Sequence, residues 1–196
     1  MRALILGIAL AAVPANAATP TLFGLEFGKP VSLPVCSKAR LPGGGYSEFI
    51  YEQRPTQTCH EPDIQLRDAP WRRGSINFPL DGVPLIMKGN TGFTLIVDGR
   101  LEGIDIDTLS HNNTNAIIRE LTAKFGRPTS VVRDRAVVVG IALPSVLATW
   151  KLPGLTVTYT NINDDLEAGR LLVETPVMER LRRQDQRAKE QARTRL

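Results

Sequence analysis

The strongest constraint on the fold of this chain is the alternation of apolar and threonine side chains over residues 155–160. Leu155, Val157 and Tyr159 alternate there with three threonines. Successive side chains of a strand point to opposite faces, so the pattern indicates a strand with one buried and one solvated face. Such strands are typical of antiparallel sheets, because parallel sheets are buried on both faces. The alternation therefore predicts an antiparallel sheet, in which a turn at Pro153-Gly154 leads back to a strand that contains Trp150.

An Asp98-Gly99 pair between two apolar segments predicts a β-hairpin with strands at residues 91–97 and 100–107. Asp-Gly is favoured in the type I′ turn because both central residues need a positive φ. We expect Asp105 and Asp107 on the solvated face of this hairpin. The register of a regular two-residue hairpin puts five apolar residues on the other face, toward the core: Phe93, Leu95, Val97, Ile104 and Ile106.

Residues 114–125 form the clearest helical pattern of the chain. The apolar residues recur at the spacing of one helix face: Ile117, Ile118, Leu121 and Phe125. Asn112 or Asn113 can cap the first turn, and Gly126 favours the end of the helix at residue 125. We therefore expect one amphipathic helix that packs on the sheet.

The remaining segments complete an α+β fold. We expect short strands at residues 83–87 and 170–174, and a loop-rich N-terminal part, up to about residue 71, that glycines and prolines interrupt. The expected architecture is an antiparallel sheet of hairpins and meanders with one amphipathic helix packed on it. The length of the chain after the N-terminal segment fits a single domain over residues 18–176.

The N-terminus has the three parts of a secretory signal peptide. Arg2 provides a positive start, residues 3–13 are apolar, and Ala15-Asn16-Ala17 is a small-x-small cleavage site. We expect cleavage after Ala17, which makes residues 1–17 the leader. The apolar run is shorter than the roughly 18–20 residues that cross a bilayer. Because Ala18 and not a cysteine follows the cut, a lipoprotein is not expected. The chain is expected to be periplasmic or secreted.

Cys36 and Cys59 are the two cysteines of the chain. In an oxidising compartment an even number of cysteines predicts a disulfide, and their spacing excludes a redox Cys-x-x-Cys site. A bridge across a loop of this size is worth about 3 kcal/mol in the chain-entropy model. It would stabilise the loop-rich N-terminal part.

The basic character of the chain comes from its end. The net charge is +4 and the isoelectric point is near 9.3. Residues 177–196 hold seven basic and three acidic side chains, so the preceding domain is close to neutral. This distribution does not support a basic nucleic-acid-binding surface, and no nucleic-acid partner is expected.

Residues 136–150 are the most apolar stretch after the leader, and they are too short to cross a membrane. One interpretation is two buried strands joined at Pro144. The alternative is a partly exposed apolar patch that binds a partner. For that alternative, the expected contact residues are Val138, Val139 and Ile141.

Residues 177–196 predict a basic helical tail, which Thr175 and Pro176 start. Glu179 with Arg183, and Asp185 with Lys189, form pairs at the i, i+4 spacing. The expected apolar stripe is thin and consists of Val177, Leu181, Ala188 and Ala192.

Two interpretations of this tail are open. The first is a solvated, fraying helix with little function. The second is electrostatic contact with an acidic protein, lipopolysaccharide or phospholipid head groups, with Arg182, Arg183 and Arg187 as steering charges. The tail lacks the large apolar face of a helix that inserts into a membrane.

No motif in the chain has the pattern of a known catalytic or phosphate-binding signature. His60 lies between Cys59 and Glu61, but neighbouring side chains of an extended segment diverge, which argues against a metal site. Asp105 and Asp107 are the one carboxylate pair with useful spacing, and a hydrolase would need them near His60 or His111. We predict no metal, no cofactor and no catalytic residue.

These observations favour a small exported, non-enzymatic protein that binds another protein of the cell envelope. It would act as an adaptor, an inhibitor or an assembly factor. Two alternatives stay open, namely binding to anionic lipid or lipopolysaccharide through the basic C-terminal helix, and a small secreted hydrolase.

Overall fold

The structure, a computed structural model, describes residues 21–40, 49–51, 54–61, 64–65, 69–83, 85–109, 111–138, 140–163 and 168–193. Its main strands are β5 (Cys59–His60), β6 (Ile64–Gln65), β7 (Arg72–Asn77), β8 (Thr91–Val97), β9 (Arg100–Thr108), β10 (Ser130–Val138), β11 (Ile141–Leu152), β12 (Leu155–Thr160) and β13 (Gly169–Glu174). Within these described residues they form one sheet in the order β10-β11-β12-β13-β9-β8-β7-β5, with β6 also paired to β7. All these pairs are antiparallel, which confirms the predicted sheet.

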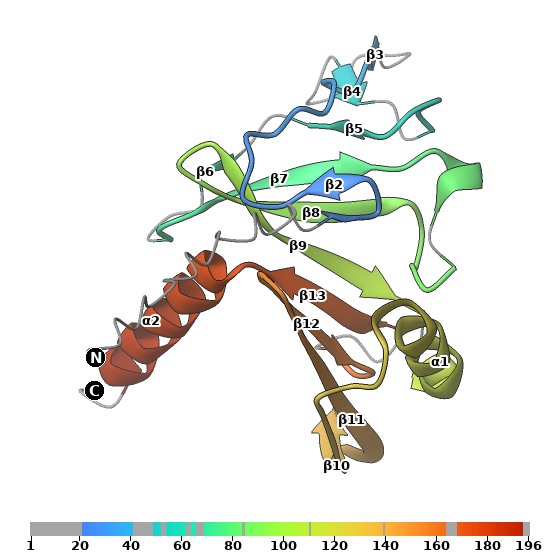
Figure 1. The fold of residues 1–196 in the computed structure, drawn as a ribbon, viewed down its shortest axis with the longest axis vertical. Helices are drawn as coiled ribbons and strands as arrows, with labels where there is room; N and C mark the ends of the chain where they lie inside the picture. The colour runs from blue at the N-terminus through green and yellow to red at the C-terminus, as the bar shows by residue number, and fades with distance from the viewer. Residues whose placement is uncertain are drawn as a thin grey trace, which may run out of the picture.

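Smaller elements surround this sheet (Figure 1). They are the strand pairs β1 (Thr21–Leu22) with β2 (Leu25–Glu26) and β3 (Lys38–Arg40) with β4 (Phe49–Tyr51), the 3-10 turns η1 (Leu80–Gly82) and η2 (His111–Asn113), and the helices α1 (Thr114–Phe125) and α2 (Pro176–Arg193). Helix α1 and the β1–β2 segment pack on one face, and α2 starts on the other. The β3–β4 pair lies beyond β5 at one end of the sheet. The predicted α+β fold is confirmed.

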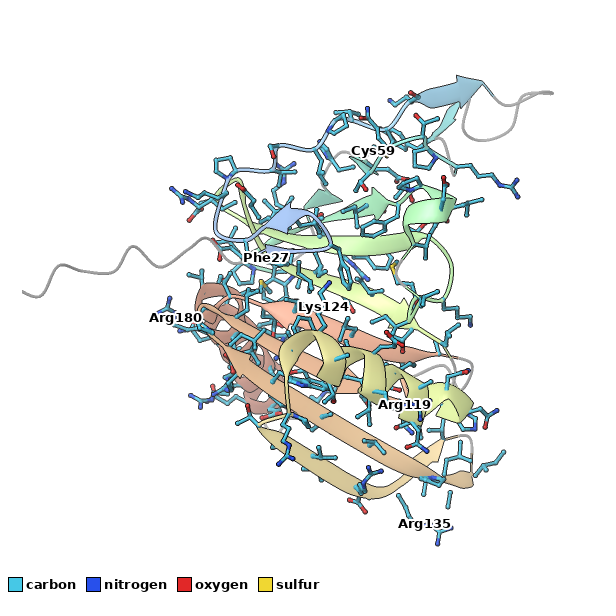
Figure 2. The ribbon with its side chains drawn as sticks, turned by 45° about the vertical axis from the view of Figure 1, so that its right-hand side comes forward. Phe27, Cys59, Arg119, Lys124, Arg135 and Arg180 are labelled. Carbon is cyan, nitrogen blue, oxygen red and sulfur yellow. A yellow bond between two sulfur atoms is a disulfide. The ribbon has the colours of Figure 1, made fainter. Side chains whose placement is uncertain are left out.

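The main hydrophobic core lies between the sheet and the layer of α1 and the β1–β2 segment (Figure 2). Strands β9, β12 and β13 contribute apolar side chains that are fully buried, and α1 contributes Ile117 and Leu121. Phe27 belongs to the same core. Trp150 fixes the end of α1, because its indole N–H donates a 2.9 Å hydrogen bond to the carbonyl of Gly126.

Helix α1 has the predicted bounds, Thr114–Phe125, and the predicted end at Gly126. Its start differs from the prediction. The Asn113 side chain makes no capping hydrogen bond, and the turn η2 leads directly into the helix. The Thr114 hydroxyl instead donates to the carbonyl of His111 at 2.5 Å. A 3-10 turn before the helix therefore replaces the side-chain cap that the two asparagines favoured.

The hairpin of β8 and β9 is confirmed, with positive φ at Asp98 (50°) and Gly99 (74°). The predicted set of core-facing residues is wrong. The register shifts between Leu95 and Ile96, where Glu102 adds an extra residue to β9. A one-residue bulge moves every side chain beyond it to the other face.

This bulge separates the two halves of the predicted apolar set. Ile104 and Ile106 belong to the main core, whereas Leu95 and Val97 pack around Met178 of α2 on the opposite face. Phe93 pairs directly with Asp105 and therefore lies on that opposite face too.

The predicted strand at residues 83–87 is not present in the described part of that segment. Met87 forms an isolated bridge with Thr108, and Leu109 donates to the carbonyl of Ile86 at 3.0 Å. Gly89 has a φ of 85°, so the chain turns immediately afterwards. The turn leaves space for one bridge to the end of β9 but not for a continuous ladder. The predicted strand at residues 170–174 is confirmed as β13.

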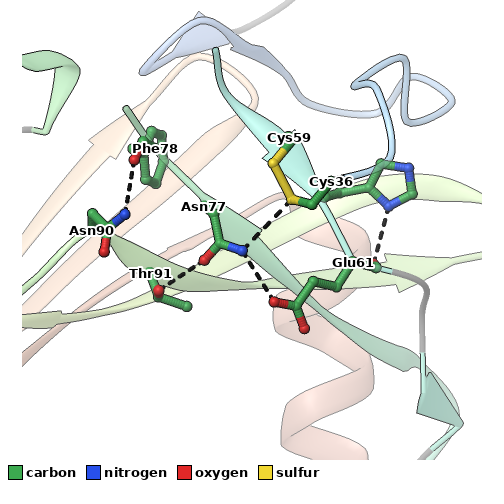
Figure 3. Close-up of a disulfide and its surroundings, with 8 residues drawn as sticks. Cys36, Cys59, Glu61, Asn77, Phe78, Asn90 and Thr91 are labelled. Atoms are coloured by element: carbon green, nitrogen blue, oxygen red, sulfur yellow. Dashed lines mark hydrogen bonds between the residues drawn. A yellow bond between two sulfur atoms is a disulfide. The ribbon is translucent and has the colours of Figure 1, made fainter. Parts of the chain in front are cut away.

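The predicted disulfide between Cys36 and Cys59 is confirmed, with the two Cα atoms 4.9 Å apart. Figure 3 shows Asn77 of β7 beside it. The Asn77 amide N–H groups contact Cys36 Sγ at 3.6 Å and donate to Glu61 at 3.0 Å, while its carbonyl accepts from Thr91 at 2.8 Å. The disulfide therefore joins the N-terminal segment to the edge of the sheet next to β7.

The predicted leader, residues 1–17, lies outside the described residues. Within the described residues, neither helix combines the length and the hydropathy needed to cross a membrane.

Candidate functional site

The β10–β11 hairpin extends beyond the rest of the sheet (Figure 1). Strand β12 pairs with β11 over Leu147–Leu152, so residues 141–146 pair with β10 alone. Strand β10 is the outermost strand, and among the described residues its outer edge has no strand beside it. This end of the sheet therefore presents main-chain groups that another strand could pair with.

Pro144 lies inside β11, opposite Arg135, and the last pair of the hairpin is Val138 with Ile141. The interpretation of two buried strands joined at Pro144 is therefore wrong. A proline fits here because β12 does not reach this part of β11. The side chain of Asn161 binds there instead, by accepting from the N–H of Val146 at 2.8 Å and donating to the carbonyl of Pro144 at 3.0 Å.

Five exposed apolar side chains of this hairpin form what we call the hairpin surface. Their exposed fractions are Val131 41%, Val132 54%, Val137 71%, Ile141 54% and Leu147 42%. Val131 and Val137 lie on the α1 side of the sheet, and Val132 and Leu147 lie on the other side. The stretch is thus apolar on both faces, unlike the alternating strand β12.

Two of the three predicted contact residues, Val138 and Ile141, face each other at the tip end of this hairpin. Ile141 is exposed and Val138 is half-buried, while Val139 lies outside the described residues. Their role in binding stays a prediction. Val131, Val132 and Val137 are additions from the structure, and the apolar residues on either side of the charged run at residues 133–135 were the signal for them.

Three charges interrupt the apolar residues of β10. Arg133, Asp134 and Arg135 are all exposed, and Asp134 accepts a 2.7 Å hydrogen bond from the backbone N–H of Arg135. Charged side chains on an edge strand oppose uncontrolled sheet-to-sheet association. The two arginines share the α1 side, because residues two apart on a strand point to the same face.

The second surface is formed by α2, whose start is anchored by the bulge in β9. The backbone N–H of Thr175 donates to the carbonyl of Glu102 at 2.8 Å, and its hydroxyl donates to the Glu102 carboxylate. The Thr175 hydroxyl also accepts from the N–H of Met178 at 3.4 Å, which caps the helix. Met178 is fully buried against Leu95 and Leu172.

The arginines predicted as steering charges differ in their environment. Arg182 makes a bidentate ion pair with the buried Glu174, at 2.6 and 2.7 Å, and so serves the attachment of α2. Arg183 is exposed but bound to Glu179 at 2.5 Å. Arg187 is exposed and has no carboxylate partner within the part of the chain that the structure describes.

The predicted apolar stripe of the tail is only partly correct. Val177 and Leu181 are half-buried, but Ala188 and Ala192 are exposed, and the buried residue is Met178. The pairs Glu179–Arg183 and Asp185–Lys189 are confirmed. The helix is continuous through Arg193, and its second half extends away from the sheet (Figure 1).

The carboxylates and histidines considered for catalysis do not form one cluster. Asp105 is buried and accepts two 2.7 Å hydrogen bonds from Arg170, with Arg73 at 3.8 Å. His60 is in β5, three strand spacings from β9, which corresponds to about 14 Å. His60 also pairs with Ile76 of the main-core face, opposite the face of Asp105.

Asp107 lies on the same face of β9 as Asp105, and both carboxylates act on Arg170 of β13. Asp107 is exposed, and His111 lies in η2 after β9, at the edge of a pocket with Arg133, Pro144 and Asn161. The pocket that His111 lines includes neither Asp105 nor Asp107, and His60 lies on the opposite face of the sheet from Asp105. Among the described residues, no three or more His, Cys, Asp or Glu side chains form a group that could hold a metal ion.

No protein-family model, curated protein or solved structure matches this chain. The arrangement of its own residues is therefore the basis for the inference of function.

Proposed function

We propose that this chain is an exported protein that binds another protein of the cell envelope through its β10–β11 hairpin. The observation that carries the proposal is the hairpin surface, which exposes apolar side chains on both faces of an outermost strand. The leader pattern supports export, and a disulfide fits an oxidising compartment. An adaptor, an inhibitor and an assembly factor can all use such a docking edge.

The proposed mode of binding is the addition of an extended segment of the partner to β10. Main-chain hydrogen bonds to the outer edge supply affinity that does not depend on sequence, and side-chain contacts on the two faces supply specificity. Full burial of one valine or isoleucine side chain contributes about 1.5–3 kcal/mol. The side chains of Val132, Val137 and Ile141 are more than half exposed, so a partner can bury most of their area.

The charges of β10 indicate which partner segment fits best. Arg133 and Arg135 lie on one face of the strand, with Asp134 on the other. Opposite charges across neighbouring strands stabilise pairing, and like charges destabilise it. The favoured partner strand is therefore apolar, with acidic side chains on the face that meets the two arginines.

A capture experiment with two matched double variants tests this proposal. Val132→Lys with Val137→Lys places charges in the hairpin surface, while Leu80→Lys with Leu85→Lys does the same at two exposed apolar residues elsewhere. Both variants should fold, because the replaced side chains are exposed. The purified proteins are cross-linked to envelope extract from the native source, and the captured proteins are quantified by mass spectrometry.

We expect specific envelope proteins to be captured by the wild type and by the Leu80/Leu85 variant, and to be lost with the Val132/Val137 variant. Equal capture by all three proteins would place the docking surface elsewhere. Absence of any specific capture by the wild type would contradict the proposal itself.

A further inference from the structure

We propose that a groove beside α2 is a binding site for a phosphate monoester group. This inference goes beyond the proposed docking function and uses a different part of the molecule. The groove has a volume of about 440 Å³. It lies at the Leu152 end of β11, whereas the tip of the hairpin adjoins the Ile141 end of the same strand. We call it the arginine groove, and its lining residues are Lys151, Pro176, Glu179, Arg180, Arg183, Gln184 and Arg187.

The arginine groove gathers four cationic side chains around one carboxylate. Arg180, Arg183 and Arg187 follow one another at spacings of three and four residues, which puts them on one face of α2. This row is about 10 Å long, at 1.5 Å per residue of helix. Lys151 comes from β11, so two elements that are distant in sequence converge on the groove. Figure 2 shows Arg180 on the side of the molecule where α2 lies.

Glu179 holds two of the four cations in place. Its carboxylate accepts from Lys151 Nζ at 3.1 Å and from Arg183 at 2.5 Å. The Thr156 hydroxyl donates to the same carboxylate at 3.1 Å and accepts from Lys151 at 3.0 Å. These contacts orient Lys151 and Arg183 before any ligand arrives, which reduces the entropy cost of binding an anion.

The other two cations have no counter-charge. Arg180 and Arg187 are exposed, and neither has a carboxylate partner among the residues that the structure describes. The opposite side of α2 differs, because Arg182 pairs with Glu174 there and Lys189 pairs with Asp185. Arg193 lies on that opposite side too, together with the carboxylate of Glu190. The excess of positive charge is therefore on the face that lines the groove.

The chemistry of this arrangement favours phosphate over carboxylate. A phosphate monoester carries close to two negative charges and three acceptor oxygens, so it can bind two guanidinium groups and an ammonium group together. A single carboxylate matches one arginine fork, and Glu179 already fills that role for Arg183.

Two double variants test the proposal, and both change the net charge of the protein by the same amount. Arg180→Gln with Arg187→Gln removes the two unpaired arginines, and Lys189→Gln with Arg193→Gln removes two cations from the opposite side of α2. Binding of glycerol 3-phosphate is measured by calorimetry. Binding to phosphatidylcholine vesicles with and without phosphatidic acid is measured by co-sedimentation at physiological ionic strength. Polyglutamate is the probe for an acidic protein.

We expect the Arg180/Arg187 variant to lose about tenfold or more in affinity for the phosphate probe, and the Lys189/Arg193 variant to bind nearly as the wild type does. Binding of free glycerol 3-phosphate indicates a soluble phosphate ligand, and binding of phosphatidic acid vesicles alone indicates a lipid head group. An equal loss in both variants would show general electrostatic attraction and overturn the site. Preference for polyglutamate, or no binding of either phosphate probe, would also overturn it.

Discussion

Three carboxylates on the α2 side of the sheet are almost inaccessible to solvent, namely Glu102, Asp105 and Glu174. Each binds a donor from another element: Thr175 for Glu102, Arg170 for Asp105 and Arg182 for Glu174. A buried carboxylate without a partner is strongly unfavourable, so each pair is sensitive to loss of its donor. Two of the three pairs attach α2 to the sheet and thereby set the position of the arginine groove.

The pair of Glu174 and Arg182 gives a direct prediction about stability. Arg182→Ala leaves the Glu174 carboxylate buried without its bidentate partner. We expect a loss of about 2 kcal/mol in the free energy of unfolding, which is below the cost for a fully buried pair because Arg182 is partly exposed. Arg187→Ala is the matched control and should change stability by less than about 0.5 kcal/mol. Chemical denaturation measures both, and equal losses would contradict the assignment of Arg182 to the anchor.

Glu179 gives a prediction about pH. Burial by itself raises the pKa of a carboxyl group, but hydrogen bonds from Lys151 and Thr156, with the charges of Lys151 and Arg183, outweigh burial and lower the pKa of Glu179 below its ordinary 4.5. A lowered pKa in the folded state stabilises the fold above the unfolded-state pKa, and this contribution is lost as the pH falls through the folded-state pKa.

Comparison with Glu179→Gln isolates this contribution. The wild type should be more stable than the variant at neutral pH, and the difference should shrink once the pH falls below about 4.5. Thermal denaturation over a series of pH values measures the difference. A difference that is constant with pH, or that grows in acid, would show that the ionised carboxylate does not hold the groove together.

At the scale of the elements, the sequence predicted well whatever depends on local pattern. The bounds of α1, the Asp98-Gly99 turn and the alternating strand β12 agree with the structure because spacing and turn chemistry determine them. The set of β8 and β9 side chains that share a face of the sheet could not be predicted in the same way. It depends on the bulge at Glu102, whose carboxylate binds Thr175, a residue 73 positions away.

The candidate surfaces, too, could be predicted only as far as they depend on local sequence pattern. The apolar stretch after residue 136 indicated Val138 and Ile141, but Pro144 suggested a break where the strand in fact continues. The proline is tolerated because β12 ends short of it and Asn161 binds that edge, which only the tertiary arrangement shows. Arg182 resembled Arg183 and Arg187 in sequence, yet its position on the helix faces Glu174, and it pairs with that buried carboxylate.

The close packing of β9 beside its bulge leads to a prediction about the stability of a Gly103 variant. A Cβ atom at Gly103 would lie 2.8 Å from the carbonyl oxygen of Val173, a backbone atom of the β9–β13 ladder that cannot move freely. We expect Gly103→Ala to cost about 1–3 kcal/mol of stability. At Gly92 the nearest atoms are side-chain atoms, the closest at 3.2 Å, so Gly92→Ala should cost less. Denaturation of the two variants tests this order, and the reverse order would contradict the packing described for β9.

At the scale of the whole molecule, one sheet carries two separate surfaces. The disulfide joins the N-terminal segment to one end of the sheet, and the hairpin surface forms the other end. The start of α2 packs on the face opposite α1, so the arginine groove lies on neither the hairpin tip nor the main core. This separation allows the hairpin and the groove to bind different ligands at the same time.

The proposed binding mode places a strand of the partner along the outer edge of β10. Hydrogen–deuterium exchange tests this pairing. It compares the free protein with the complex that is captured from envelope extract without cross-linking. We expect partner binding to slow exchange of the backbone amides over Ser130–Val138, with little change in β5 or β7. Unchanged exchange over β10 in a complex that protects other segments would show that the partner does not pair with this edge.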